Sequence, residues 1–146
     1  MATNYRELLV WQRAMELAEA VYVVASSLPE IERFGLAAQL RRAAVSVPSN
    51  IAEGHERRSR ADYRRFVTIG CGSLAELETQ LELASRLYQL DAAAIARAVE
   101  LSDQTGRLLR SIERKLRAPA LGEATAGYDA GELERASPQP SALSPQ

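Results

Sequence analysis

Residues 41–83, from Arg41 to Leu83, decide the fold and read RRAAVSVPSNIAEGHERRSRADYRRFVTIGCGSLAELETQLEL. Apolar residues recur at helical spacing in two runs, and the first run contains Pro48. A break at Gly54 and His55 is followed by an arginine-dense segment that leads into the second run. This pattern predicts two helices joined by a short basic loop, and we expect the rest of the chain to pack around the pair.

The first helix of the pair is predicted to run from Phe34 to Ala52. A proline inside a helix removes one backbone donor and costs about 3 kcal/mol, so we expect a kink at Pro48. Gly54 can take a left-handed conformation, and we expect it to end the helix. The inner face is predicted to consist of Leu36, Leu40, Ala44, Val47 and Ile51.

Five polar residues are predicted to form a structural polar lock around this kink. Short polar side chains can bond to backbone groups that a kink frees, and a partly buried carboxylate beside small residues needs a partner. The alternative hypothesis is that the same residues line a ligand site. The predicted lock comprises Ser46, Asn50, Glu53, Ser73 and Glu76.

The second helix of the pair is predicted to start at Ser59, which stands three residues before Asp62 as in a capping box. It is predicted to continue to about Gln89. Gly70 and Gly72 interrupt its apolar stripe at about 1 kcal/mol each relative to alanine, so we expect them to mark a close crossing with the kinked helix. The stripe consists of Tyr63, Phe66, Val67, Leu74, Leu77, Leu81 and Ala84.

Two further helices are predicted to flank this pair. One runs from Tyr5 to Leu28, where Pro29 stops it, and the other runs from the N-cap Asp91 to Ala118. Together they predict an all-α fold, an antiparallel up-down-up-down four-helix bundle with a kinked second helix, over residues 1–118. Residues 119–146 lack apolar periodicity and are predicted to form a disordered acidic tail rich in Pro, Ala and Ser.

The first helix carries more apolar residues than one seam requires. They form two adjacent stripes, which are Leu8, Trp11, Met15, Ala18 and Tyr22, and Leu17, Val21, Val24 and Leu28. Other apolar residues lie off the main stripes of the bundle, namely Leu9, Val10, Val23, Ile69 and Leu87. This surplus predicts self-association, and the alternative is that these side chains complete the core of a monomer.

Composition argues against several classes of protein. The one cysteine, Cys71, cannot form an intramolecular disulfide, and the N-terminus lacks a signal-peptide pattern, so we expect a reduced, cytoplasmic protein. No apolar run is long enough for a membrane span. The one histidine, His55, has no Glu three residues before it, unlike the Glu-x-x-His pairs of di-iron bundles. We therefore expect no metal, no cofactor and no catalytic residue.

Positive charge is concentrated in one segment, although the net charge of the chain is −1. Between Arg41 and Arg65, seven arginines stand against three acidic residues. The segment is either a solvated helix end or a binding patch for phosphates. The candidate nucleic-acid-binding residues are Arg57, Arg58, Arg60, Arg64 and Arg65.

Three segments resemble the four-helix-bundle family of 23S rRNA intervening-sequence proteins. They are Leu8 to Trp11, the run QLRRAAVSVPSNIAEG at residues 39–54, and the run GSLAELETQ at residues 72–80. The resemblance extends from about Tyr5 to Leu116. It implies a small cytoplasmic bundle that assembles as a homopentamer and has no enzymatic activity. A related member, the accessory protein of diversity-generating retroelements, is a basic pentamer that binds nucleic acid and a reverse transcriptase.

Two functions fit these features. The first is a non-enzymatic oligomeric interaction module whose arginines bind RNA or DNA phosphates through charge-assisted hydrogen bonds. The alternative is a protein-binding scaffold with no nucleic-acid role. An enzyme that uses Glu53, Glu76 and His55 is a third hypothesis, but nothing in the sequence positions a nucleophile or a metal for it.

Overall fold

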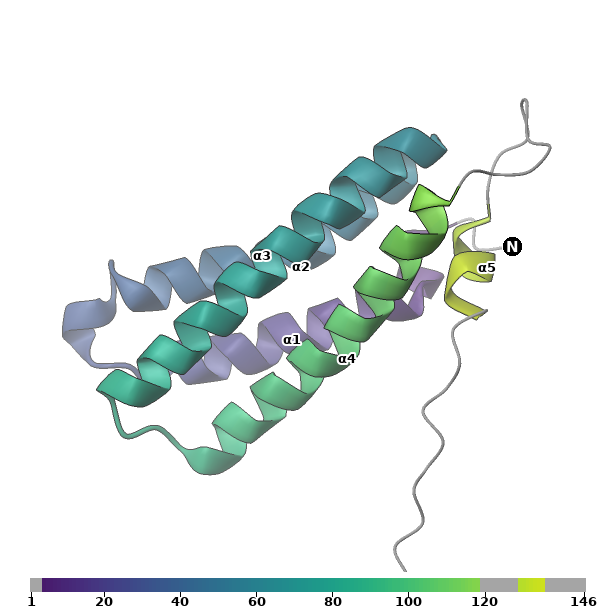
Figure 1. Cartoon of the computed structure of the whole chain (residues 1–146). Helices are drawn as coiled ribbons and strands as arrows, with labels where there is room; N and C mark the ends of the chain where they lie inside the picture. The colour runs from purple at the N-terminus through teal and green to yellow at the C-terminus, as the bar shows by residue number, and fades with distance from the viewer. Residues whose placement is uncertain (1–3, 119–128, 136–146) are drawn as a thin grey trace, which may run out of the picture.

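Helices are the only regular elements in the part of the chain that the computed structural model describes, residues 4–118 and 129–135. Four long helices run antiparallel in sequence order, and a short fifth helix lies beside them (Figure 1). Within the described residues, none of these helices has the length and apolar character needed to cross a membrane. The elements are η1 (Tyr5–Glu7), α1 (Leu9–Ser26), η2 (Glu30–Glu32), α2 (Leu36–Glu56), α3 (Arg60–Leu87), α4 (Ala92–Arg117) and α5 (Ala130–Arg135).

The four long helices enclose one hydrophobic core. Each packs against the next in sequence, and α1 closes the ring by packing against α4. The predicted all-α four-helix bundle is therefore confirmed. The largest fully buried side chains come from all four helices and from the residue before α1, and they include Leu8, Leu17, Leu40, Ile51, Tyr63, Leu77, Leu101, Leu109 and Ile112.

The second apolar stripe of the first helix faces this core, whereas the first stripe is only partly buried, with Trp11 and Ala18 packed at the edge of the core. Val10, which was predicted to lie off the stripes, is fully buried, whereas Met15 and Tyr22 are 38% and 43% exposed. Residues one position apart on a helix point about 100° apart, so only one of two adjacent stripes can face the core directly. The core stripe is Val10, Ala14, Leu17, Val21, Val24 and Leu28.

Helix α2 passes through Pro48 without a break and changes direction along its length (Figure 1). The prediction that Gly54 ends this helix is wrong. Gly54 is buried inside α2, where a Cβ atom would lie 2.7 Å from Cβ of Phe66, and the helix continues to Glu56. Arg58 takes the left-handed conformation instead, with φ of 58°. Glycine at position 54 therefore allows α2 and α3 to approach closely.

Helix α3 begins as predicted, with the Ser59 side chain accepting a hydrogen bond from the Asp62 backbone N–H. The predicted role of Gly70 and Gly72 is not supported. A Cβ atom on Gly70 would be in ordinary contact with Leu109 of α4, 3.9 Å away, and one on Gly72 would meet nothing within 4 Å. The tight approach of α2 to α3 is instead at Gly54, where an added Cβ atom would collide with α3.

The chain after α4 differs from the predicted disordered tail at residues 129–135, which form α5. Ala130 of this helix is buried, and Leu133 packs against the core cluster. Apolar contact with the bundle thus gives a segment without apolar periodicity a defined position. The prediction for residues 119–128 and 136–146 lies outside the described residues.

Candidate functional site

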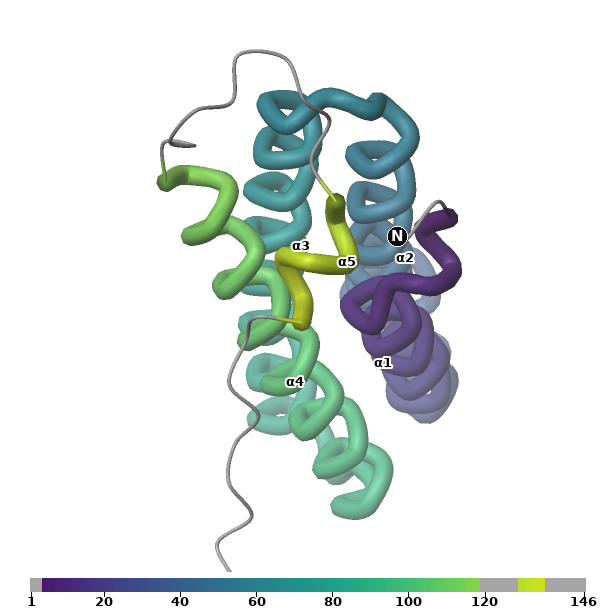
Figure 2. Tube along the Cα trace, turned by 90° about the vertical axis from the view of Figure 1, so that its right-hand side faces the viewer, coloured from purple at the N-terminus to yellow at the C-terminus, as the bar shows by residue number. Residues whose placement is uncertain are grey.

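One end of the bundle brings together the start of α1, the end of α2, the start of α3 and the end of α4. Figure 2 looks onto this end, with α5 lying between α4 and α1. Arg60 joins α3 to α4, because its Nη2 atom donates to the backbone carbonyl oxygens of Lys115, at 2.8 Å, and Ala118, at 3.2 Å. Two basic segments about 50 residues apart in sequence therefore share one surface.

The ring of Phe66 organises two of the predicted arginines. The guanidinium groups of Arg57 and Arg65 each lie 5.5 Å from the ring centroid. Arg57 also pairs with Glu53 at 3.2 Å, one helical turn away on α2. Stacking on an aromatic ring restricts a guanidinium while leaving its N–H groups at the edge of the plane. Both side chains remain exposed, so they are accessible to an anionic ligand.

The other three predicted arginines differ from one another. Arg58 and Arg64 are exposed, the first in the turn between α2 and α3 and the second on the first turns of α3. Arg60 is only half exposed and satisfies the last carbonyl groups of α4, which have no partners within their own helix. The structure therefore brings all five together at one end, but assigns Arg60 to holding α3 against α4.

Sequence reasoning missed a second basic segment, which lies at the end of α4. Residues 107–117 read RLLRSIERKLR, with five basic residues against Glu113 alone. Burial, and to a smaller extent the charge of Arg114, lowers the pKa of Lys115. The signal was present, because a basic last turn is typical of a helix C-terminus and an antiparallel α4 must end beside the start of α3. We call the surface formed by Arg57, Arg58, Arg64, Arg65, Arg114 and Arg117 the arginine end.

The predicted polar lock forms in part. The Oγ atoms of Ser46 on α2 and Ser73 on α3 lie 2.8 Å apart, and Asn50 Nδ2 donates to the Ser46 carbonyl oxygen at 2.7 Å and to its Oγ at 2.9 Å. The structure does not bring Glu53 and Glu76 to this cluster. Both are exposed, and each bonds within its own helix, Glu53 with Arg57 and Glu76 with Gln80. An exposed carboxylate needs no buried partner, so the lock consists of three residues.

The remaining candidate catalytic residues, His55 and Cys71, lie within the packing of the helices. His55 is buried against the ring of Tyr63, with ring centroids 6.3 Å apart. Burial, and then the charge of Glu113, raises the pKa of the Cys71 thiol, which is opposite to the shift of an activated nucleophile. Among residues 4–118 and 129–135, no cluster of three His, Cys, Asp or Glu side chains could hold a metal ion.

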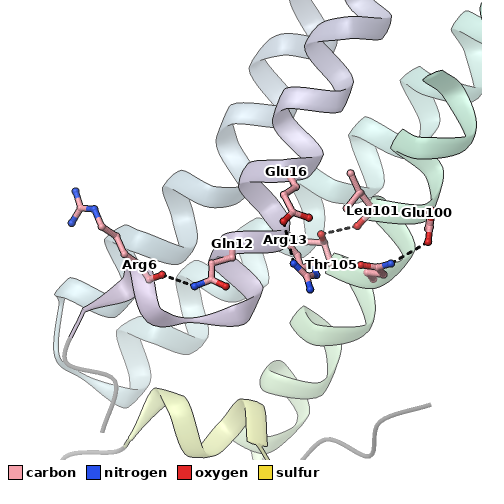
Figure 3. Close-up of polar contacts among 8 residues, drawn as sticks. Arg6, Gln12, Arg13, Glu16, Glu100, Leu101 and Thr105 are labelled. Carbon is pink, nitrogen blue, oxygen red and sulfur yellow. Dashed lines mark hydrogen bonds and ion pairs between the residues drawn. The ribbon is translucent and has the colours of Figure 1, made fainter. Parts of the chain in front are cut away.

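The polar contacts drawn where α1 and α4 lie side by side fall within one helix or join α1 to η1 (Figure 3). The buried Thr105 hydroxyl donates to the carbonyl oxygen of Leu101 at 2.7 Å, and Arg13 pairs with Glu16 at 3.2 Å. Such bonds satisfy polar groups within one helix and leave the helix–helix contact to apolar packing. This region supports the bundle rather than a ligand.

The family assignment rests on comparison of the whole chain with known proteins. A family model for 23S rRNA-intervening sequence proteins matches residues 6–111. No curated protein matches the chain. The matched region covers nearly all of the four-helix bundle and ends before the last turns of α4, so α5 lies outside it. The chain therefore belongs to the 23S rRNA-intervening sequence protein family.

Proposed function

We propose that this protein is a non-enzymatic, oligomeric interaction module that binds the phosphates of RNA or DNA through the arginine end. The observation that carries the proposal is the pair of hydrogen bonds from Arg60 to the last turn of α4. These bonds hold the basic segment at residues 57–65 beside the basic segment at residues 107–117. A single basic segment could be either a phosphate-binding surface or a solvated helix end. Two basic segments that converge on one surface favour a phosphate-binding surface.

The arginine end offers guanidinium groups in a form suited to phosphate. A guanidinium donates two parallel hydrogen bonds to a phosphate group, and stacking of Arg57 and Arg65 on Phe66 reduces the side-chain freedom that binding would cost. Glu53 and Glu113 neutralise part of the charge through their pairs with Arg57 and Arg117. Contacts of this kind recognise phosphate groups rather than the base sequence.

Oligomerisation would multiply the arginine end. The resemblance to pentameric family members supports this part of the proposal, as do the exposed Met15, Tyr22 and Val23 on the outer face of α1. Several arginine ends in one assembly would engage a single nucleic-acid chain with higher avidity than one copy. We expect the assembly to act in a reducing cytoplasm, since the chain contains only one cysteine.

Two single substitutions of equal charge test the proposal. Arg64→Ala should weaken binding of labelled single-stranded RNA at low salt and leave the free energy of unfolding nearly unchanged, because Arg64 is exposed. Arg60→Ala should lower the free energy of unfolding by about 1 to 3 kcal/mol, because it removes charged donors from two carbonyl oxygens. Wild-type protein that binds neither RNA nor DNA at low salt would refute the proposed function.

A protein-binding scaffold is the second candidate, favoured by an apolar feature at the opposite end of the bundle. Ile31 and Phe34 are 85% and 86% exposed in the turn between α1 and α2. Apolar side chains this exposed are common in protein–protein contacts. Replacing both with Ser should abolish capture of a protein partner without changing RNA affinity; capture that persists after the double replacement would count against this candidate.

A further inference from the structure

Helix α5 supplies the cap for the first helix of the bundle. Leu8, at the N-cap position of α1, has no polar atom in its side chain, so the first N–H groups need another partner. Both oxygens of Glu134 fill this role: Oε2 accepts from the Leu9 N–H at 2.8 Å, and Oε1 accepts from the Val10 N–H at 2.7 Å. A carboxylate from 125 residues away therefore caps this helix start, where its negative charge meets the positive end of the helix dipole.

Contacts with the bundle hold α5 in this position. Ala130 is buried, Leu133 is partly buried, and the Lys115 ammonium group donates to the carbonyl oxygen of Leu133. Six residues are too few for a stable isolated helix, so α5 depends on these contacts and on Glu134. Burial raises the pKa of Glu134, although the Leu9 and Val10 N–H groups oppose the shift, so desolvation of the charge also disfavours docking. A short helix that depends on docking for its order can open locally without unfolding the bundle.

Docked α5 adds negative charge beside the arginine end. The segment at residues 129–135 carries Asp129, Glu132 and Glu134 against Arg135. Lys115 connects the two features, because its carbonyl oxygen accepts from Arg60 while its ammonium group bonds to α5. Figure 2 shows α5 lying across this end of the bundle. α5 lies outside residues 6–111, the region that the family model matches.

We propose that α5 is an autoinhibitory latch. When docked, it caps α1, engages Lys115 and lowers the positive potential of the arginine end; when released, it withdraws Asp129, Glu132 and Glu134 from that end, which then attracts phosphate groups more strongly. This inference rests on the proposed function, and it adds a mechanism that regulates the same surface.

Three full-length variants test the latch. Ala130→Asp adds a charge at a buried position and should release α5, and Glu134→Ala removes both acceptor oxygens of the cap. Glu132→Ala is the matched control, since it makes the same charge change at an exposed position of α5. Release is measured by hydrogen exchange of the Leu9 and Val10 amides, and affinity by anisotropy of labelled single-stranded RNA at low salt.

We expect both release variants to lose amide protection and to bind RNA about three- to tenfold more tightly, the size of one or two regained charge interactions. The Ala130→Asp result is the more decisive, because the added negative charge alone would weaken binding. Glu132→Ala should keep the Leu9 and Val10 amides protected and change affinity much less.

Three outcomes would overturn the latch. Release with unchanged RNA affinity would leave the arginine end as a binding surface but remove the inhibitory role of α5. Amides that stay protected in both release variants would show a contact that does not open. Failure of wild type and every variant to bind RNA or DNA would refute the proposed function, and the latch with it.

Discussion

Replacing Gly54 with Ala tests the close contact between α2 and α3 on which the shape of the arginine end depends. The added methyl group would lie 2.7 Å from Cβ of Phe66 and 3.2 Å from Cδ2 of Tyr63. The first distance is shorter than real Cβ contacts, and Cβ of Phe66 is fixed by its own backbone. The two helices must therefore move apart.

The magnitude follows from two opposing effects. Overpacking of this kind costs about 1 to 3 kcal/mol, and the rigid position of the Phe66 Cβ favours the upper part of the range. Alanine in a helix is favoured over glycine by about 1 kcal/mol. We therefore expect Gly54→Ala to lower the free energy of unfolding by about 1 to 2 kcal/mol, measured by urea denaturation at fixed protein concentration.

Gly72→Ala is the matched control, because a methyl group there meets nothing within 4 Å in the same helix that receives the Gly54 contact. Only the helix-propensity effect applies, so this variant should be more stable than wild type by about 0.5 to 1 kcal/mol. The essential result is that the two substitutions change the free energy of unfolding in opposite directions. If Gly54→Ala is stabilising like Gly72→Ala, the inferred close approach of α2 and α3 is incorrect.

Three further predictions concern the lock, the thiol and the latch. Ser73→Ala should lower the free energy of unfolding by about 1 kcal/mol in urea denaturation, because it removes a hydrogen bond between α2 and α3; no change would mean that the lock does not stabilise the bundle. Cys71 should react with iodoacetamide with a pH midpoint above its ordinary pKa of 9.0, because burial raises the pKa of the thiol, and a midpoint below that value would contradict this environment. Docking of α5 should be strongest below the ordinary carboxyl pKa of 4.5 and weaken as pH rises through the raised pKa of Glu134, since the docked state binds the proton more tightly. Leu133 methyl chemical shifts across this range should report the change, and docking that strengthens with pH would contradict the sign.

Local patterns predicted the parts of the fold that depend on neighbours in sequence. The Ser59 cap of α3 and the four helical runs are read from spacings of three and four residues, and the structure contains both. The choice between two apolar stripes on α1 was not predictable in this way. Both stripes satisfy helical periodicity, and only the positions of α2 and α4 decide which one is buried.

Distance along the chain explains what the sequence did not reveal at the site. Gly54 looks like a helix terminator until Phe66 is known to pack against it, and Arg60 looks like its exposed neighbours until α4 ends beside it. The contact between Glu134 and the start of α1 spans 125 residues and has no local signature. The prediction was wrong for two of the five lock residues, because the side chains of Glu53 and Glu76 are exposed.

The salt dependence of RNA binding by two matched triple variants tests the central claim most directly. One variant replaces Arg58, Arg64 and Arg65 with Ala at the arginine end. The other replaces Arg33, Arg86 and Arg97 at the opposite end and has the same net charge. If the arginine end binds phosphates, the slope of log affinity against log salt should fall by about 2 in the first variant, at about 0.7 for each lost contact, and stay unchanged in the second. Equal slopes in the two variants would contradict the assignment of phosphate binding to the arginine end.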